Sequence, residues 1–357
     1  MKTRIKGIAL LLAVILTFSG LLGGSAPIRV SSKPAGTEPN PQTPPTTVPP
    51  TTETTVPPTA ASTVPPTEEP TVPPTTPPAT QPQPTEPAPI PLTASHAFIY
   101  SSHSVSFLFL KGTMDERIYP ASITKLFTAY VALQYLDAAT QITVGNAIYT
   151  VPPDSSLAFL TVGDVLTVED LIHGMLLPSG GDAARVIAAE AGKVICKNSN
   201  LPDVEAITAF MEEMNRQAAA VGMTGTHYVT PDGFHHPDHY TTIADLLLLA
   251  KLSLETPLIR KIAATTEYSV TLPSRNITWK NTNMLLHKES PHPEFYRETA
   301  IGLKTGYTDA AGRCLLSAFI VDGETILAGV FGCPDPDMTY IAQFENICYL
   351  YDTYIAQ

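Results

Sequence analysis

Residues 120–125 read Pro-Ala-Ser-Ile-Thr-Lys, and an apolar run, residues 126–133, follows them directly. Apolar side chains recur every three to four residues here, which predicts a buried helix that begins at or next to Ser122. Residues three positions apart lie on the same face of a helix, so Ser122 and Lys125 are expected to bring a hydroxyl and an amine together. The hydroxyl then lies near the positive end of the helix, where backbone N–H groups are unpaired.

This pair fits a nucleophile with its base. A serine is a weak nucleophile until a base removes its proton, and a lysine can be that base if burial or a neighbouring cation lowers its pKa. The same spacing also fits a helix-capping serine beside a solvated lysine, so further motifs must decide between the two.

Two later stretches could join this pair. Residues 177–182, Leu-Pro-Ser-Gly-Gly-Asp, lie between two expected helices, where the Ser179 hydroxyl can point into a cleft, although an interhelical turn capped by the aspartate is equally compatible. Residues 301–307 look like a strand edge. There Lys304 and Thr305 could hold a carboxylate, and Gly306 would let a substrate backbone come close.

The apolar pattern of the other residues predicts the secondary structure around these motifs. Strands are expected at both ends of the region and helices between them, so the fold class is α/β (α+β), with one antiparallel sheet built from the two ends, flanking helices and an inserted helical lobe. The boundary of such a lobe often holds a ligand site. The expected strands are 96–100, 105–110, 301–305, 314–321 and 325–331, with a turn at Asp322-Gly323, and the expected helices are 167–177, 182–191 ending at Gly192, 203–221 ending at Gly222, one from Thr242, and 338–355.

The N-terminal quarter differs in composition. Residues 1–26 combine three basic residues, an apolar run from Ile8 to about Leu22 and a small-residue stretch, which is the layout of a secretory signal or an uncleaved anchor. Residues 27–93 are rich in proline and threonine and repeat Thr-Val-Pro-Pro-Thr every eight residues from Thr47, which indicates an extended spacer. Residues 94–357 are then the folded catalytic domain. The protein is expected to be exported to the extracytoplasmic cell envelope, secreted or tethered by its N-terminal segment.

Charge and cysteine usage narrow the function. The formal net charge of −12 argues against nucleic acid as a partner. Four cysteines are too few for a disulfide framework and could pair in three ways, and no Cys-x-x-Cys is present. Four histidines, His227, His235, His236 and His239, could suggest a zinc peptidase, but no His-Glu-x-x-His accompanies them, so no metal and no cofactor is expected.

Taken in order, Ser-x-x-Lys, Ser-x-Gly and Lys-Thr-Gly resemble the signature of penicillin-binding proteins and serine β-lactamases. The wording around the motifs is similar to that of the low-molecular-mass serine D-alanyl-D-alanine carboxypeptidases. The similar stretches, which extend from about residue 94 to the end, include 120–126, 174–184, 226–234, 281–286 and 303–312.

The resemblance implies a β-lactamase/transpeptidase-like fold and removal of the terminal D-alanine from peptidoglycan stem peptides that end in D-Ala-D-Ala, with β-lactams as covalent inhibitors. It implies that Ser122 is the nucleophile, that Lys125 is its base and that Ser179 passes a proton to the leaving D-alanine. By the same resemblance Lys304 and Thr305 bind the terminal carboxylate, and the backbone N–H groups of Ser122 and Tyr307 form the oxyanion hole. Gly306 completes this substrate-binding strand.

The chain departs from the family pattern at Gly181, where the motif has asparagine. The missing amide predicts slow but real turnover and faster acylation in Gly181→Asn, unless Gly181 has a positive φ that asparagine tolerates less well. A small β-domain and amphipathic anchor that many relatives carry after the catalytic domain are also missing. Two alternatives stay open: a serine β-lactamase, for which no deacylating glutamate motif is evident, and a catalytically weak penicillin-binding or wall-binding sensor.

Overall fold

The computed structural model describes residues 92–356, which belong to one compact unit. The expected signal or anchor, residues 1–26, and the spacer up to residue 91 lie outside the described residues. Among the residues that are described, no helix combines the length and apolar character that a membrane crossing requires.

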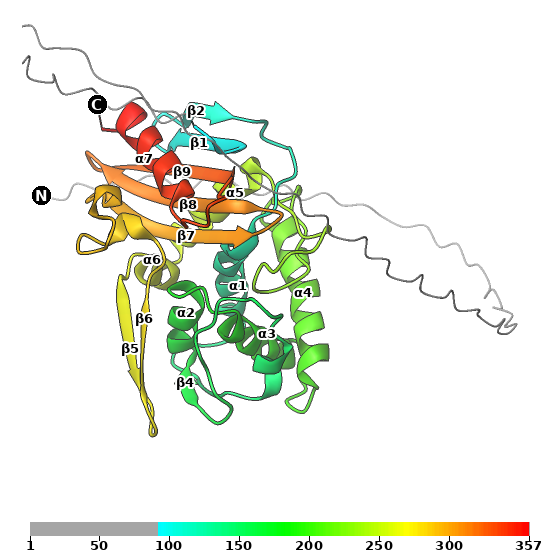
Figure 1. Ribbon diagram of the computed structural model, residues 1–357. Helices are drawn as coiled ribbons and strands as arrows, with labels where there is room; N and C mark the ends of the chain where they lie inside the picture. The colour runs from blue at the N-terminus through cyan, green and yellow to red at the C-terminus, as the bar shows by residue number, and fades with distance from the viewer. Residues whose placement is uncertain (1–91, 357) are drawn as a thin grey trace, which may run out of the picture. The chain divides into compact units, whose positions relative to one another are not determined.

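A five-stranded antiparallel sheet forms the centre of this unit (Figure 1). The first strand pairs along its whole length with the last, Ala97 opposite Val330 and Tyr100 opposite Leu327. The predicted sheet built from both ends of the domain is therefore confirmed. Its strands, in sheet order, are β2 (Ser106–Lys111), β1 (His96–Ser101), β9 (Glu324–Cys333), β8 (Gly312–Val321) and β7 (Ala300–Thr308).

The two faces of this sheet bury separate apolar clusters. Successive strand side chains point to opposite faces, so Phe98 packs in one cluster while Ala97 and Ile99 pack in the other. The C-terminal helix α7 (Ala342–Tyr354) covers the second face against β8 and β9 (Figure 1). The first face carries α1 (Thr124–Ala132) and α5 (Ile243–Glu255), so the sheet is buried on both sides.

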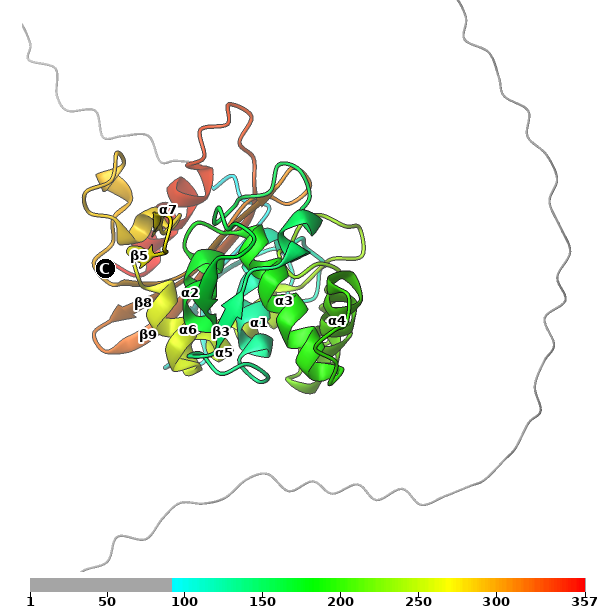
Figure 2. The same ribbon diagram turned by 90° about the horizontal axis from the view of Figure 1, so that it is seen from below.

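The helical lobe is inserted between β2 and β7, and Figure 2 shows its helices in front of the sheet when the molecule is seen from below. Thr167 begins one of its helices with the predicted capping box, in which Thr167 and Asp170 satisfy each other's backbone N–H groups. The lobe contains α2 (Val168–Leu176), α3 (Gly181–Ile195), α4 (Asp203–Ala220), the short strands β3 (Gln141–Thr143) and β4 (Val165–Thr167), and the 3-10 helix η2 (Asn146–Thr150).

β7 extends three residues beyond its expected end, to Thr308, and two helix boundaries differ by four residues. Gly192 lies inside α3 and does not end it, because its role is close packing: a Cβ there would lie 1.9 Å from the Ala206 carbonyl oxygen of α4. The last helix begins at Ala342 and not at residue 338, since the preceding loop holds Met338 and Tyr340 at positive φ. Elements that the sequence analysis did not name are α6 (Pro257–Ala263), the hairpin of β5 (Glu267–Thr271) and β6 (Asn276–Lys280), and the 3-10 helices η3 (Met284–Leu286) and η4 (Pro293–Phe295).

The other predicted helix starts and turns are confirmed. Gly222 has φ +89° and follows the end of α4, and the Thr242 side chain caps the start of α5 by accepting from the Asp245 N–H. Asp322 and Gly323 both have positive φ in the two-residue β8–β9 turn, as a type I′ hairpin turn requires. All four cysteines are free thiols, of which only Cys196 is exposed.

Candidate active site

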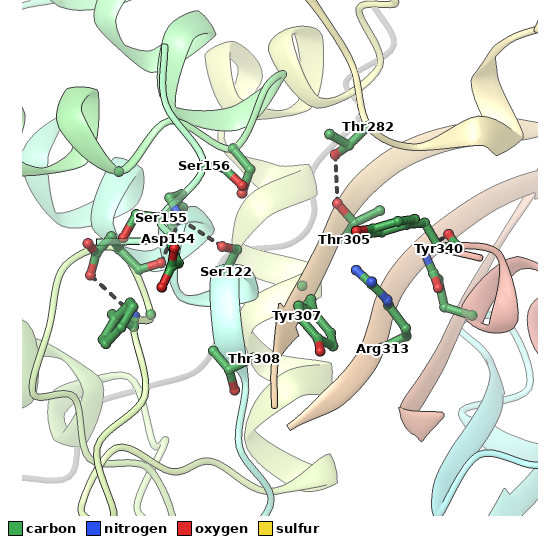
Figure 3. Close-up of a pocket in the computed structure, with 18 of the residues that line it drawn as sticks. Ser122, Asp154, Ser155, Ser156, Thr282, Thr305, Tyr307, Thr308, Arg313 and Tyr340 are labelled. Carbon is green, nitrogen blue, oxygen red and sulfur yellow. Dashed lines mark hydrogen bonds between the residues drawn. The ribbon is translucent and has the colours of Figure 1, made fainter. Parts of the chain in front are cut away.

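A cleft of about 760 Å³ opens where β7 faces the helical lobe (Figure 3). It brings together residues from segments far apart in the sequence, as the boundary between sheet and lobe predicted. Its walls include the two motif serines, the outer half of β7, the 154–156 and 232–234 loops and the segment before α7. The lining residues used below are Ser122, Lys125, Asp154, Ser156, Ser179, Gly181, Asp232, Thr282, Thr305, Gly306, Tyr307, Arg313 and Tyr340.

Ser122 and Lys125 form a direct contact at this cleft. Ser122 lies in the 3-10 turn η1 (Ala121–Ile123), which leads into α1, and Lys125 lies in the first turn of α1. The Lys125 amine donates to Ser122 Oγ at 2.7 Å and to the main-chain oxygen of Asp232 at 2.6 Å. The predicted juxtaposition of hydroxyl and amine is thus present.

The environment of Lys125 suits a base. Burial of the side chain lowers the pKa of Lys125 to about 8, against the opposing attraction of Asp232 and Asp182, while Arg185 lowers it further. A lysine with its ordinary pKa would be almost entirely protonated near neutral pH, whereas this one is neutral in a useful fraction of molecules.

The turn between α2 and α3 places Ser179 on the cleft wall. Ser179 has φ +66°, an uncommon conformation for a residue with a side chain, and is about 6% exposed. No described residue forms a hydrogen bond with its hydroxyl, which leaves it available to a substrate. The neighbouring Gly180 allows the turn to be this tight, because a Cβ there would lie 2.5 Å from the Gly174 carbonyl oxygen.

Gly181 is the first residue of α3 and does not have a positive φ. The conformational objection to asparagine at this position is therefore wrong. A Cβ at residue 181 would meet Asp232 Oδ2, the Ser156 carbonyl oxygen and Val151 at 3.4 Å each, which is ordinary van der Waals contact.

On β7, Gly306 brings the strand against the nucleophile. A Cβ on Gly306 would lie 3.0 Å from the Pro120 carbonyl oxygen and 3.2 Å from the Ser122 nitrogen, so a side chain would push the strand away. Gly306 and Tyr307 both line the cleft, and β7 is the last strand of the sheet on this side. The backbone of Tyr307 therefore follows directly after the point of contact with the Ser122 turn.

Lys304 and Thr305 occupy different positions. Thr305 lines the cleft, and its hydroxyl lies 2.6 Å from that of Thr282 (Figure 3). Lys304 is about 1% exposed and is not part of the cleft wall; its amine donates to the main-chain oxygen of Thr305 at 3.1 Å and to its hydroxyl at 3.3 Å. Burial, together with the positive charge of Lys125, holds the pKa of Lys304 well below its usual value.

Arg313 is a cleft residue that the sequence analysis missed. Its guanidinium lies between two rings, 3.7 Å from the Tyr307 centroid and 4.2 Å from the Tyr340 centroid, and Nε donates to Asp335 at 2.8 Å. The residue is about 6% exposed, and Nη2 is buried without a partner among the described residues. Figure 3 shows the guanidinium pointing into the cleft beside Thr305. Nothing in the sequence indicates this position, because it depends on strand pairing, which sets Arg313 on β8 opposite Tyr307 on β7.

Of the four histidines that suggested a metal site, His239 has a structural role: it joins its own loop to α1. His239 is buried, contacts the Thr124 hydroxyl through Nε2 at 2.8 Å and accepts from the Val229 N–H through Nδ1. Burial lowers the pKa of His239 to about 3, so it is neutral. Among residues 92–356, no group of histidine, cysteine, aspartate and glutamate side chains is arranged to hold a metal ion.

Comparison with proteins of known sequence gives consistent relatives. The chain is 32% identical over 226 residues to a D-alanyl-D-alanine carboxypeptidase of Streptomyces sp. strain K15, an alignment that covers 60% of this chain and 73% of that protein. It is 28% identical over 227 residues to the D-alanyl-D-alanine carboxypeptidase DacF of Bacillus subtilis, covering 62% of this chain and 53% of that protein. The chain thus spans little more than half the length of the Bacillus relative.

Solved structures agree with the fold. The Streptomyces K15 DD-transpeptidase superimposes with a TM-score of 0.65 at 28% identity, covering 76% of this chain and all of that chain. The D-alanyl-D-alanine carboxypeptidase DacD of Francisella tularensis superimposes with a TM-score of 0.59 at 25% identity, covering 76% of this chain and 73% of that chain. The D-alanyl-D-alanine carboxypeptidase family, peptidase S11, matches residues 82–334, and the chain belongs to this family of serine peptidases.

Proposed function

We propose that this protein removes the terminal D-alanine from peptidoglycan stem peptides that end in D-Ala-D-Ala, through an acyl-enzyme on Ser122. The observation that carries the proposal is the 2.7 Å contact between the Lys125 amine and Ser122 Oγ on the wall of an open cleft. Membership of the carboxypeptidase family gives the reaction class, and the lowered pKa of Lys125 gives the base.

The first half of the reaction forms the ester. Neutral Lys125 takes the Ser122 proton as the hydroxyl oxygen attacks the carbonyl carbon between the two D-alanines. The backbone N–H groups of Ser122 and Tyr307 donate to the oxygen that becomes negative. The C–N bond then breaks, and Ser179, whose hydroxyl is free of protein partners among the described residues, relays the proton from Lys125 to the leaving amine. Lys125 is neutral again after this transfer.

In the second half, water attacks the ester carbonyl while neutral Lys125 removes a proton from that water. Lys125 then returns the proton to Ser122 Oγ as the ester C–O bond breaks, and the shortened peptide leaves. All of these steps use side chains and backbone groups of this chain. A β-lactam enters the same first half, since its strained amide is attacked by the same hydroxyl, and remains attached where deacylation is slow.

The free carboxylate of the substrate binds at Thr305. Because Lys304 is buried behind this residue, it acts through Thr305: its amine donates to the Thr305 hydroxyl and orients it. Arg313 adds the second donor, since its guanidinium points into the cleft on the same side of β7 (Figure 3). A carboxylate held by a hydroxyl and a guanidinium fits the charge-assisted geometry that such groups favour.

A second candidate is transfer of the acyl group to an amine, because the superimposed Streptomyces enzyme is named a DD-transpeptidase. The two reactions share the acyl-enzyme and differ in the acceptor. Incubation of a donor peptide with a glycine peptide separates them: a carboxypeptidase yields the shortened acid, whereas a transpeptidase yields the new amide.

The place of action follows from the N-terminal sequence. A secretory signal or anchor at residues 1–26 and a proline-rich spacer carry the domain to the cell envelope, where its substrate is found.

Mass spectrometry after incubation with a penicillin tests the proposal. The expected result is one adduct that peptide mapping places on Ser122, lost in Ser122→Ala and retained in Ser156→Ala, a matched serine on the cleft wall. D-alanine release from a D-Ala-D-Ala peptide completes the test. Label on another residue overturns the assignment. Preferential β-lactam hydrolysis supports the β-lactamase, and labelling without turnover of either substrate supports the sensor.

A further inference from the structure

A buried ion pair lies beside the catalytic couple and has no part in the steps above. Asp232, about 3% exposed, accepts from Arg185, with Oδ2 3.3 Å from Nε and Oδ1 3.4 Å from Nη2. Asp232 lines the cleft next to Gly181 and Lys125. Burying two charges costs free energy that their mutual attraction only partly offsets, so a pair placed here calls for a reason other than stability.

Asp232 also holds Lys125 in place. Its main-chain oxygen accepts from the Lys125 amine at 2.6 Å, and the next residue, Gly233, lets the loop approach the Ser122 turn. A Cβ on Gly233 would lie 1.9 Å from the Ala121 carbonyl oxygen. The loop is thus fixed against the nucleophile, and the Asp232 carboxylate is fixed with it.

Helix α3 supplies the other half of the pair. Gly181 and Arg185 are four residues apart and therefore lie on the same face, toward Asp232. The Asp232 carboxylate lies against the first turn of α3, since a Cβ on Gly181 would make van der Waals contact with Asp232 Oδ2 at 3.4 Å. The positive end of the helix macrodipole favours an anion at this place.

Three charged groups act on the Lys125 amine: Asp182 and Arg185 from α3 and Asp232 from its loop. On β7, Lys304 has its own pKa lowered by burial and by Lys125. α1 itself carries no other charge. Burial favours the neutral amine, and among the charges that act on the pKa of Lys125 the strongest opposition comes from Asp232. Although burial opposes its ionisation, Arg185 and Lys125 together lower the pKa of Asp232, so the carboxylate is anionic.

We propose that Asp232 and Arg185 are a positioning pair that sets the pH at which Lys125 becomes the base for Ser122. The carboxylate stabilises the ammonium that forms when Lys125 takes the Ser122 proton, and Arg185 limits how strongly the carboxylate does so. This inference rests on the acyl-enzyme mechanism proposed above and adds the groups that tune its base.

The test is the pH profile of acylation by a chromogenic β-lactam, followed by stopped flow in the full chain. Acylation is expected to rise with pH as Lys125 loses its proton. Asp232→Asn removes the charge and keeps the main-chain acceptor, so the pKa of Lys125 falls and this rise moves to lower pH, by roughly one pH unit. Arg185→Met removes the opposing charge, so the rise moves to higher pH. In the double variant it returns toward the native position.

If the two residues only stabilised the fold, Asp232→Asn and Arg185→Met would not shift the pH profile in opposite directions. Asp154→Asn removes another carboxylate of the cleft wall and is expected to leave the profile in place. Thermal melting checks each variant, and if Asp232→Asn does not fold, the direction of the Arg185→Met shift still decides. Unchanged profiles, or shifts in the same direction, overturn the inference while leaving acylation at Ser122 intact. Failure of the native protein to be acylated at Ser122 overturns the proposed function instead.

Discussion

At the scale of single residues, three basic side chains at the cleft differ in what burial does to their charge. Lys125 contacts Ser122 directly, Lys304 lies beneath Thr305, and Arg313 points into the cleft between two tyrosines. Burial destabilises the charged form of an amine and therefore lowers its pKa, whereas a guanidinium stays charged. Lys125 is therefore suited to proton transfer and Lys304 to holding the Thr305 hydroxyl, whereas Arg313 is suited to binding an anion.

Replacing Arg313 by methionine is expected to weaken the capture of peptides with a free terminal carboxylate. Loss of a charge-assisted hydrogen bond corresponds to a fall of about ten- to hundredfold in kcat/KM. The same variant should process a C-terminally amidated peptide as the native protein does, because no carboxylate is present. Steady-state kinetics on the two peptides measure the difference.

The matched control is Arg297→Met. Arg297 also lies over a ring, Tyr351 at 5.3 Å, and pairs with Asp352 at 2.9 Å, but it is not part of the cleft wall. This variant should leave kcat/KM for both peptides unchanged. If Arg313→Met lowered kcat/KM equally for the free-acid and the amidated peptide, Arg313 would support the shape of the cleft and would not bind the carboxylate.

Gly181→Asn is expected to acylate about three- to tenfold faster than the native protein, because an amide at this position can add one hydrogen bond beside Lys125 or the substrate. The start of α3 accepts a side chain here without strain, since its Cβ would make only van der Waals contacts. Stopped-flow acylation compares the two proteins. Slower acylation at an unchanged melting temperature would show that the space left by glycine is needed, as it would be if Asp232 had to move.

At the scale of elements, close contacts at glycines determine where the motifs meet. Gly306 lets β7 touch the Ser122 turn, and Gly192 lets α3 approach α4 within the helical lobe. In both cases the atom that a Cβ would meet belongs to the backbone, which cannot rotate away as a side chain would. Substitution therefore moves a whole element.

Gly192→Ala is expected to lower stability by separating α3 from α4. Overpacking of this kind costs about 1–3 kcal/mol, which corresponds to a fall of roughly 2–10 °C in melting temperature for a domain of this size. Calorimetry measures the change. Gly181→Ala, at the start of the same helix and with room for a Cβ, is the control and should melt at the native temperature. A stable Gly192→Ala protein would mean that the two helices can shift without loss of packing.

At the scale of the whole molecule, one sheet joins both ends of the folded domain and carries the cleft at the boundary of the inserted lobe. β1 pairs with β9, so the nucleophile near the start of the domain and the substrate strand near its end are built on one framework. Residues 33–91 precede this framework in the sequence. Their composition predicts a tether, so we expect them to contribute reach and no catalytic group.

Deleting residues 33–91 should leave turnover of soluble D-Ala-D-Ala peptides unchanged and reduce release of D-alanine from the wall of intact cells, because a tether provides reach and not chemistry. Replacement of the segment by a Gly/Ser chain of equal length is the control for length. A large loss in the assay with soluble peptides would contradict the spacer and indicate that the segment acts on the cleft.

The sequence alone determined the three motifs, their order and the class of sheet. Helical spacing placed Ser122 and Lys125 on one turn, and strand patterns at both ends of the domain predicted the antiparallel sheet, because local periodicity reflects which face of an element is buried. Boundaries such as the start of α7 were missed. Asp335, which Arg313 fixes from β8, accepts from the Thr339 and Tyr340 N–H groups and so holds a loop where the first helical turn was predicted.

Only the tertiary structure decided which charged residues surround the motifs. Asp232 and Arg185 are 47 positions apart in sequence, and Arg313 faces the cleft only because strand pairing sets it opposite Tyr307. Lys304, expected at the carboxylate, proved to be buried beneath Thr305, since a strand residue points to one face or the other and the two neighbours alternate. Burial and the distances between charges arise from packing, and they set the pKa of Lys125, on which the proposed chemistry depends.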